Sequence, residues 1–324
     1  MCQDAPEASV IKEPELQMRM STTALQLLLV AFMAFPCSQR AFAVGGSVVG
    51  WGASDYGAIN VPADATNIVA LAAGVVHTLA LTDNRRLVQW GHAAELPPPG
   101  ISNLISIAAG GLNSMGIRSD SSLWIWSQQA SVMNYPADAT NLIKVSVGNI
   151  HVMALRTDGR VFAWGDDFWG MTVVPDEATN IVDIAAGGTF SVGLRSDGAV
   201  LVWGLPGRFT LAVSNIVAVG ASYDSALALR SDGRLFVWDT DSGLNDIVAI
   251  DGAAVHWIAL RKDGTVVVVG SNSQGQGTIP PGLGNVSAIA AEGEHNLALF
   301  NVPGLQILTP PRSQTVLAGD GVLL

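Results

Sequence analysis

The chain has few cysteines and little positive charge. Its 324 residues include two cysteines, Cys2 and Cys37, and 16 lysines and arginines against 27 acidic residues. Both cysteines precede residue 44, so the rest of the chain can form neither a disulfide framework nor a cysteine zinc site. The net charge of −11 argues against nucleic acids and anionic membranes as partners, because both bind basic surfaces.

The common signatures of catalysis are also missing. The sequence has no glycine-rich phosphate loop, nucleophile elbow or paired-carboxylate motif. The one acidic cluster beside a histidine, Glu292, Glu294 and His295, lacks a second histidine at metal-ligand spacing. We therefore expect no enzyme activity, no cofactor and no metal site.

The longest apolar run lies near the N-terminus. Residues 23–35, TALQLLLVAFMAF, follow Arg19, and Ala41-Phe42-Ala43 fits the small-x-small pattern of a cleavage site. The run is too short for a stable membrane span. The sequence thus predicts a leader at residues 1–43 with a signal peptide at 18–43. The mature protein is expected to be secreted or at the cell surface, with no membrane span.

A repeated hairpin dominates the remainder. In residues 151–165, HVMALRTDGRVFAWG, two alternating apolar strands flank Asp158-Gly159, a pair that favours a tight turn. The second strand is apolar on both faces, so copies of the hairpin must stack to cover it. Strands ending in tryptophan recur at Trp51, Trp90, Trp126, Trp164, Trp203 and Trp238, with Val269 in the seventh place.

The count of repeats predicts a closed ring. A strand of small residues, such as IVALAAG at 68–74, precedes each hairpin, which is typical of a β-propeller. The chain opens with a lone tryptophan strand at 47–52 and closes with an inner pair at 286–300. Pairing these segments removes the exposed sheet edges. We expect an all-β, seven-bladed β-propeller over residues 44–302, closed by its N- and C-terminal strands and monomeric.

One repeat position holds most of the histidines. It contains His77, His151, His256 and His295, while another blade carries Phe190 there. A position that accepts phenylalanine is a packing position. We therefore expect these histidines to be structural.

The repeat A-A-G-x-x-H-x-L-A-L-x-x-D-G-x-V-x-x-W-G, seen at 72–81 and 151–165, resembles the regulator of chromosome condensation repeat. The short blades, as in WGASDYGAINVPADATNIVALAAG at 51–74, are similar to those of secreted bacterial members. Among these members is a propeller that inhibits class A β-lactamases. The resemblance covers residues 47–300 and implies a seven-bladed ring.

Residues 303–324 leave the repeat. The segment ILTPPRSQTVLAGDGVLL has a proline pair, an alternating strand and a Gly-Asp-Gly turn. It resembles the first strands of an immunoglobulin-like domain. We expect a linker followed by the start of an incomplete domain of that kind.

Propeller loops fall on two faces. We define the upper face by the turns before the histidine position and the segments after each Trp-Gly, and the lower face by the Asp-Gly turns. The upper loops combine acids, Asp224 and Asp241 among them, with aromatic residues, the side chains that often anchor protein partners. The candidate partner-binding residues are Asp55, Tyr56, Asp166, Asp167, Phe168, Trp169, Arg208, Phe209, Tyr223 and Trp257.

These features predict a secreted, non-enzymatic recognition module that binds a protein partner with a basic surface through the upper face. Two alternatives remain open. The chain could supply a structural repeat domain to a large surface protein, or inhibit a secreted enzyme such as a β-lactamase.

Overall fold

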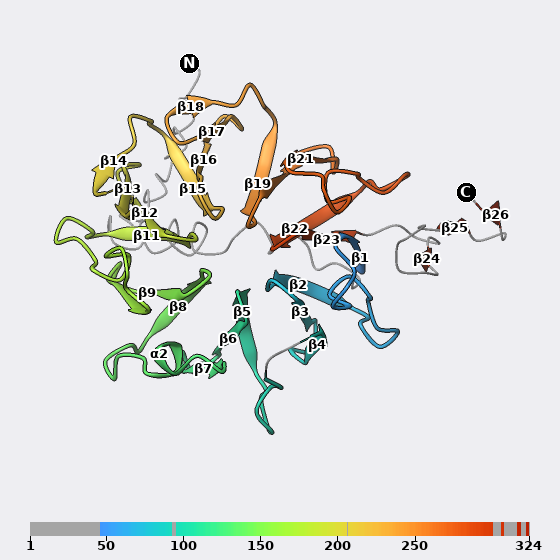
Figure 1. Cartoon of the computed structure of the whole chain (residues 1–324), viewed down its shortest axis with the longest axis horizontal. Coiled ribbons are helices and arrows are strands. Elements are labelled where there is room, and N and C mark those ends of the chain that lie inside the picture. The colour runs from blue at the N-terminus through green and yellow to red at the C-terminus, as the bar shows by residue number, and fades with distance from the viewer. Residues whose placement is uncertain are drawn as a thin grey trace, which may run out of the picture.

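A computed structural model describes residues 46–92, 95–205, 207–300, 306–307, 316–318 and 322–323. Seven antiparallel sheets are arranged around a common centre (Figure 1). The predicted all-β, seven-bladed propeller is confirmed. The leader at 1–43, with its signal peptide, lies outside the described residues.

Each blade is a meander of three or four strands, counted outward from the centre. Blades 1 to 3 are β2 (Ile68–Ala73), β3 (His77–Thr82) and β4 (Leu87–Gly91); β5 (Leu104–Gly110), β6 (Asn113–Arg118) and β7 (Leu123–Trp126); and β8 (Leu142–Val147), β9 (His151–Arg156) and β10 (Val161–Gly165). A short helix, α2 (Ala130–Met133), follows blade 2.

Blades 4 and 5 carry a fourth strand. They are β11 (Ile181–Ala186), β12 (Phe190–Arg195), β13 (Val200–Gly204) and β14 (Phe209–Thr210), and β15 (Ile216–Ala221), β16 (Ala226–Arg230), β17 (Leu235–Val237) and β18 (Thr240–Asp241). Blade 6 is β19 (Ile247–Gly252), β20 (His256–Arg261) and β21 (Val266–Gly270). Blade 7 is β22 (Val286–Glu292), β23 (His295–Phe300) and β1 (Ser47–Gly52).

The ring is closed by strands from the two ends of the repeat region, as predicted. β1 pairs antiparallel with β23, from Ser47 opposite Phe300 to Gly52 opposite His295. One face of this blade packs on blade 1 through Val48 and Leu297, and the other packs on blade 6 through Val49 and Phe300. Blade 7 is therefore a full member of the ring.

The inner strands are set by local sequence at both ends. Each is preceded by an asparagine or aspartate with a positive φ, from Asn67 (55°) to Asn285 (51°), and these residue types tolerate that conformation. At the far ends the strands converge closely: a Cβ at Gly110 would lie 2.2 Å from the carbonyl oxygen of Val147 in the next blade. Small residues at these strand ends let the blades approach each other.

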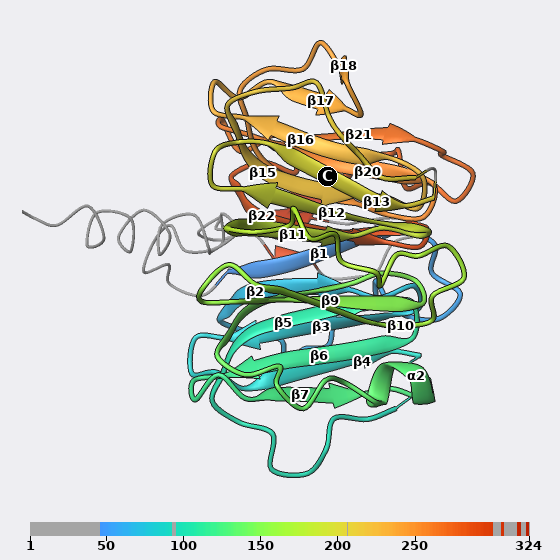
Figure 2. The same cartoon turned by 90° about the vertical axis from the view of Figure 1, so that its left-hand side faces the viewer.

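The strands run across the disc from one face to the other (Figure 2). α2 follows the outer strand of blade 2 and lies at the upper face, on the right of that view. No helix in the described part of the chain is long and apolar enough to cross a membrane. Beyond the ring, β24 (Gln306–Ile307), β25 (Val316–Ala318) and β26 (Val322–Leu323) form a small antiparallel sheet.

Candidate functional site

Backbone hydrogen bonds place the loops on the faces expected from the sequence. In blades 1, 3, 4, 6 and 7 the residue after the third strand donates to the turn before the histidine position, as Asp166 does to Ile150 (2.9 Å) and Leu205 to Thr189 (3.0 Å). Both kinds of segment therefore share the upper face. At the opposite end the Asp-Gly turns bond to the start of the inner strands, as Thr157 does to Asn141 (3.0 Å).

The segment Asp166–Trp169, between β10 and β11, presents two large aromatic rings to solvent. The exposed fractions are 74% for Phe168 and 44% for Trp169, and the ring centroids lie 6.0 Å apart in an edge-on arrangement. The carboxylate of Asp167 accepts a hydrogen bond of 2.9 Å from the backbone of Thr172, which fixes the shape of the loop. The loop holds its aromatic side chains out from the surface.

The base of this loop is anchored in the core. The carbonyl of Met171 accepts hydrogen bonds from the indole of Trp203 and the hydroxyl of Ser191, both at 2.9 Å. Gly170, just before it, has a φ of 76°, which other residues adopt only with strain. The exposed rings therefore stand on a fixed support.

Backbone hydrogen bonds connect the upper-face turns of blades 4 to 6. Gly188 bonds to the carbonyl of Tyr223 (3.2 Å), and Tyr223 bonds to that of Ala253 (3.1 Å). Leu205, Tyr223 and Val255 are all more than two-fifths exposed. We call the exposed apolar side chains of the upper face from blade 3 to blade 6 the apolar arc: Phe168, Trp169, Leu205, Tyr223 and Val255.

The candidates Asp55 and Tyr56 lie on another part of the upper face. They follow β1 of blade 7, whereas the apolar arc begins after blade 3 (Figure 1). Tyr56 is 59% exposed, and its ring lies 6.0 Å from that of His92. The structure does not bring this pair together with Phe168 and Trp169.

Trp257 was wrongly predicted to be a surface residue. It is buried and packs among Leu227, Leu229 and Ile247 between blades 5 and 6. In β20 it lies opposite Val269 of β21, whereas in blade 3 the tryptophan is on the outer strand, with Trp164 opposite Val152. The tryptophan of blade 6 has therefore moved to the neighbouring strand and still fills the core.

Arg208 and Phe209 are also engaged elsewhere. Phe209 is half-buried in β14, and its ring lies 6.0 Å from that of Trp238. Arg208 is exposed, and its guanidinium lies 3.7 Å from the carboxylate of Glu177. Neither residue contributes to the apolar arc.

Leu205 and Val255 were missed by sequence reasoning. Each lies beside a recognisable repeat motif. Leu205 comes directly after Trp203-Gly204, and Val255 comes directly before His256. A search for apolar residues at these two repeat positions would have found both.

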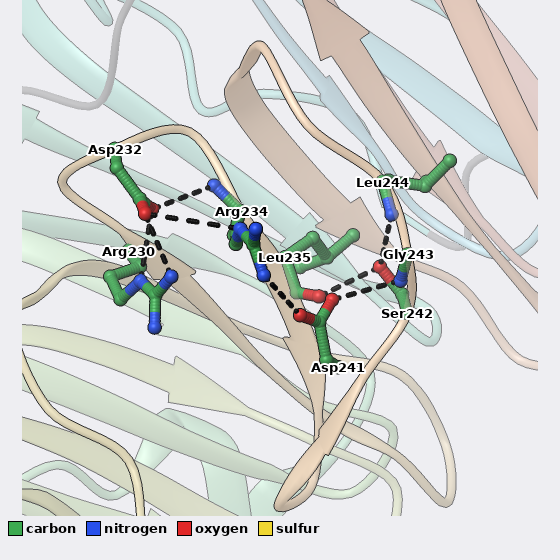
Figure 3. A network of polar contacts seen from close by, with 8 residues as sticks. All are labelled: Arg230, Asp232, Arg234, Leu235, Asp241, Ser242, Gly243 and Leu244. Carbon is green, nitrogen blue, oxygen red and sulfur yellow. Dashed lines mark hydrogen bonds and ion pairs between the residues drawn. The ribbon is translucent and has the colours of Figure 1, made fainter.

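Several basic residues of the lower face are neutralised locally. Arg156, Arg195 and Arg230 each pair with the aspartate two residues later. Figure 3 shows the last of these pairs together with Arg234, which also contacts Asp241 at 3.0 Å. Asp241, expected on the upper face, is thus held by a lower-face arginine, because β18 returns the chain beside β17.

These ion pairs also shift the pKa values of the aspartates. The side-chain hydrogen bonds from Arg156 and Arg230 lower the pKa of Asp158 and of Asp232 to about 2. On the upper face, no ion pair among the described residues involves Asp55, Asp166, Asp167 or Asp224. The charge available to a partner there is negative.

The acidic end of β22 does not form a metal centre in the described part of the chain, where no group of three or more histidine, cysteine or acidic side chains could hold a metal ion. Burial and the neighbouring charge of Asp251 raise the pKa of Glu292 to about 8. Burial also raises the pKa of Asp251 to about 6 and lowers the pKa of His295 to about 3.

The chain shares its repeat and its fold with known proteins. The model of the regulator of chromosome condensation (RCC1) repeat matches residues 142–168 and 181–209, which span blade 3 and most of blade 4. No curated protein matches the chain.

Three solved structures have similar folds at low identity. Prp20p of Saccharomyces cerevisiae, described with its binding to Gsp1p and histones, is 14% identical at a TM-score of 0.68, over 82% of this chain and 94% of that one. Yeast RCC1 (Prp20) in complex with Kap60 is 14% identical at a TM-score of 0.70, over 91% of this chain and 97% of that one. Human WBSCR16 is 15% identical at a TM-score of 0.64, over 79% of this chain and 100% of that one. The chain is thus a propeller that contains RCC1 repeats.

Proposed function

We propose that this chain is a non-enzymatic recognition module that binds a protein partner through the apolar arc and the acidic loops of its upper face. We also propose that it acts outside the cell, secreted or at the cell surface, on the basis of the signal-peptide pattern at residues 18–43. The partner is expected to carry basic residues around an apolar pocket.

The observation that carries the proposal is the uneven distribution of exposed apolar side chains. None of the exposed large hydrophobic residues in the described part of the chain lies in a lower-face turn, whereas five of them form the apolar arc. Solvent-exposed aromatic residues that stand close together on a rigid support are typical anchors of protein interfaces. The upper face therefore has the chemistry of a docking surface.

Electrostatics favours a basic partner. Three lower-face arginines pair with nearby aspartates, whereas Asp166 and Asp167 directly precede the exposed rings without such a pair among the described residues. Unpaired surface carboxylates steer a positively charged partner toward the rings and accelerate association at low salt. Protein binding also fits the similar propeller Prp20p, whose structure was described with its binding to Gsp1p and histones.

Site-specific photo-crosslinking tests the proposal. A photoreactive amino acid replaces Phe168 in one protein and Ser231, in a lower turn, in a matched control, and both are exposed to extract or culture medium from the native source. We expect a defined crosslinked protein only from position 168. A species captured equally from both positions, or only from position 231, would contradict the proposed face.

The identity of the crosslinked protein separates the two alternatives. An enzyme whose activity falls when the propeller binds would make the chain an inhibitor, as in the β-lactamase-inhibiting propeller that the repeats resemble. A large surface protein carrying the same repeats would favour a structural role within such an assembly.

A further inference from the structure

The histidines at the repeated position connect one blade to the next. The Nε2 atom of His77 lies 2.8 Å from Ser114 Oγ, that of His151 lies 2.9 Å from Ser191 Oγ, and that of His256 lies 2.8 Å from Asn296 Oδ1. In each case the partner belongs to the following blade. All three rings are buried.

Histidine and polar partner occur together along the ring. The fourth histidine, His295, precedes the blade that has Thr78 at the partner position. The three blades without a histidine carry Asn113, Phe190 and Ser225, and their successors have Val152, Ala226 and Trp257 at the partner position. A residue that merely filled space would not need a polar neighbour. The hydrogen bond itself forms at three of these four boundaries, whereas the Nε2 atom of His295 has no partner among the described residues and Thr78 donates to Ala58.

At the boundary of blades 3 and 4 the chain of hydrogen bonds continues outward. Ser191 donates its single hydroxyl hydrogen to the carbonyl of Met171, so it must accept a hydrogen from His151. His151 is therefore protonated on Nε2. Its other nitrogen, Nδ1, is buried and has no hydrogen-bond partner.

The end of this relay is the base of the exposed aromatic loop. Met171 lies two residues after Trp169, and Thr172, the next residue, donates to Asp167 from within the loop. A side chain at the blade boundary thus fixes the point from which the two rings project.

We propose that His151 and Ser191 are positioning residues for the segment Asp166–Trp169, and that protonation of His151 in mildly acidic solution loosens this segment and weakens partner binding. The consequence for binding rests on the proposed function, whereas the effect on the loop does not.

The surroundings of His151 give the direction of the pH effect. Burial lowers the pKa of His151 from 6.5 to about 4, and the carboxylate of Asp167, in the loop itself, acts in the opposite direction. From blade 4 the ring faces Ser191, which carries no charge. A proton on the unpartnered Nδ1 would place a positive charge in a buried site, and the cost of burying that charge exceeds the attraction of Asp167. The hydrogen bonds from His151 to Ser191 and from Ser191 to Met171 are therefore expected to be stable at neutral pH and weakened in acid.

Amide hydrogen exchange, corrected for the intrinsic pH dependence of exchange, tests the loop without any partner. We compare residues 166–173 with residues 53–60 and 271–278 in His151→Phe, Ser191→Ala and Ser191→Thr. His151→Phe and Ser191→Ala should lower protection of 166–173 by roughly three- to tenfold, as expected for the loss of one hydrogen bond, and leave the other two segments unchanged. Ser191→Thr should retain protection, because Thr78 makes the equivalent bond to Ala58.

The pH profile separates positioning from packing. Wild-type residues 166–173 should lose protection between pH 6.5 and pH 4, and His151→Phe should remove this step. The matched control His256→Phe removes the same contact beneath residues 271–278, so it should keep the step at 166–173.

Unchanged protection in both His151→Phe and Ser191→Ala, or equal losses in all three segments, would overturn the proposal. If His151→Phe does not fold, the comparison of Ser191→Ala with Ser191→Thr tests the proposal in its place. Failure of crosslinking at position 168 would count against the proposed function and leave this result unaffected.

Discussion

Trp51 and Asn296 lie opposite each other on β1 and β23, and both donate hydrogen bonds to the carbonyl of Gln276, each at 2.9 Å. The two residues come from opposite ends of the propeller sequence, and Gln276 belongs to the loop between blades 6 and 7. This junction uses the same kind of contact that anchors Met171 between blades 3 and 4. It shows that blade 7 is built like the others although its strands are far apart in the chain.

Closure can be tested by deletion. Removing residues 47–52 leaves one edge of β23 unpaired and takes Val48, Val49 and Trp51 out of the core, so thermal stability should fall sharply. Removing residues 306–324 should have little effect, because the described strands β24, β25 and β26 pair with one another and not with a strand of the ring. Equal melting temperatures for the two deletions would argue against this closure.

The buried histidines should make the propeller acid-sensitive. Burial lowers the pKa of His77 and of His151 from 6.5 to about 4, so the unfolded chain binds protons that the folded chain does not. Their contribution is present above pH 6.5 and is lost as the pH falls toward 4, by roughly 2 to 3 kcal/mol for each histidine at pH 4.5. Urea unfolding at pH 7 and pH 4.5 measures this difference. The double variant His77→Phe/His151→Phe should lose less stability between the two pH values than wild type does. An equal loss would contradict the lowered pKa values of these two histidines.

Glu292 should act in the opposite direction. Because its pKa is raised to about 8, the folded protein holds a proton that the unfolded chain releases near pH 4.5. This contribution is complete below pH 4.5 and is lost as the pH rises to 8. Glu292→Gln should therefore stabilise the protein at pH 8 by roughly 2 to 4 kcal/mol, toward the lower value because the side chain is partly accessible. Urea unfolding at pH 5 and pH 8 checks this, and a variant less stable than wild type at pH 8 would contradict it.

The contrast between Trp257 and Trp169 tests the assignment of core and surface. Trp257→Ala should lower the free energy of unfolding by about 3 to 5 kcal/mol, because it empties a buried site between blades 5 and 6. Trp169→Ala should change it by no more than about 0.5 kcal/mol, because the ring is exposed. Urea unfolding of both variants gives the comparison, and the reverse order would exchange their roles.

The architecture could be predicted from sequence because its determinants are local and repeated. Asp158-Gly159 specifies a turn, Trp164 ends an outer strand, and the alanines of the inner strands fit where blades converge. Seven copies of this pattern fix the number of blades. The unpaired strand at 47–52 then has one natural place in the ring.

The site was less predictable because it depends on contacts between distant residues. The exchange of Trp257 with Val269 is visible only once the register of β20 and β21 is known. The pairing of Asp241 with Arg234 likewise requires the short strand β18, which no hydrophobic pattern marked. Asp166–Trp169 was identified correctly as an exposed loop, whereas its anchor at Ser191 requires the packing of two blades.

The proposed binding face is tested most directly by affinity measurements on the partner crosslinked at position 168. Wild type, Trp169→Ala and the lower-face control Arg156→Ala are compared at physiological salt. We expect Trp169→Ala to raise Kd by about thirtyfold, which corresponds to a hot spot of ~2 kcal/mol, chiefly through faster dissociation. Arg156→Ala should leave Kd within about twofold, because its charge is already paired with Asp158 on the opposite face. An unchanged Kd for Trp169→Ala together with a large loss for Arg156→Ala would contradict the account and place the binding surface on the lower face.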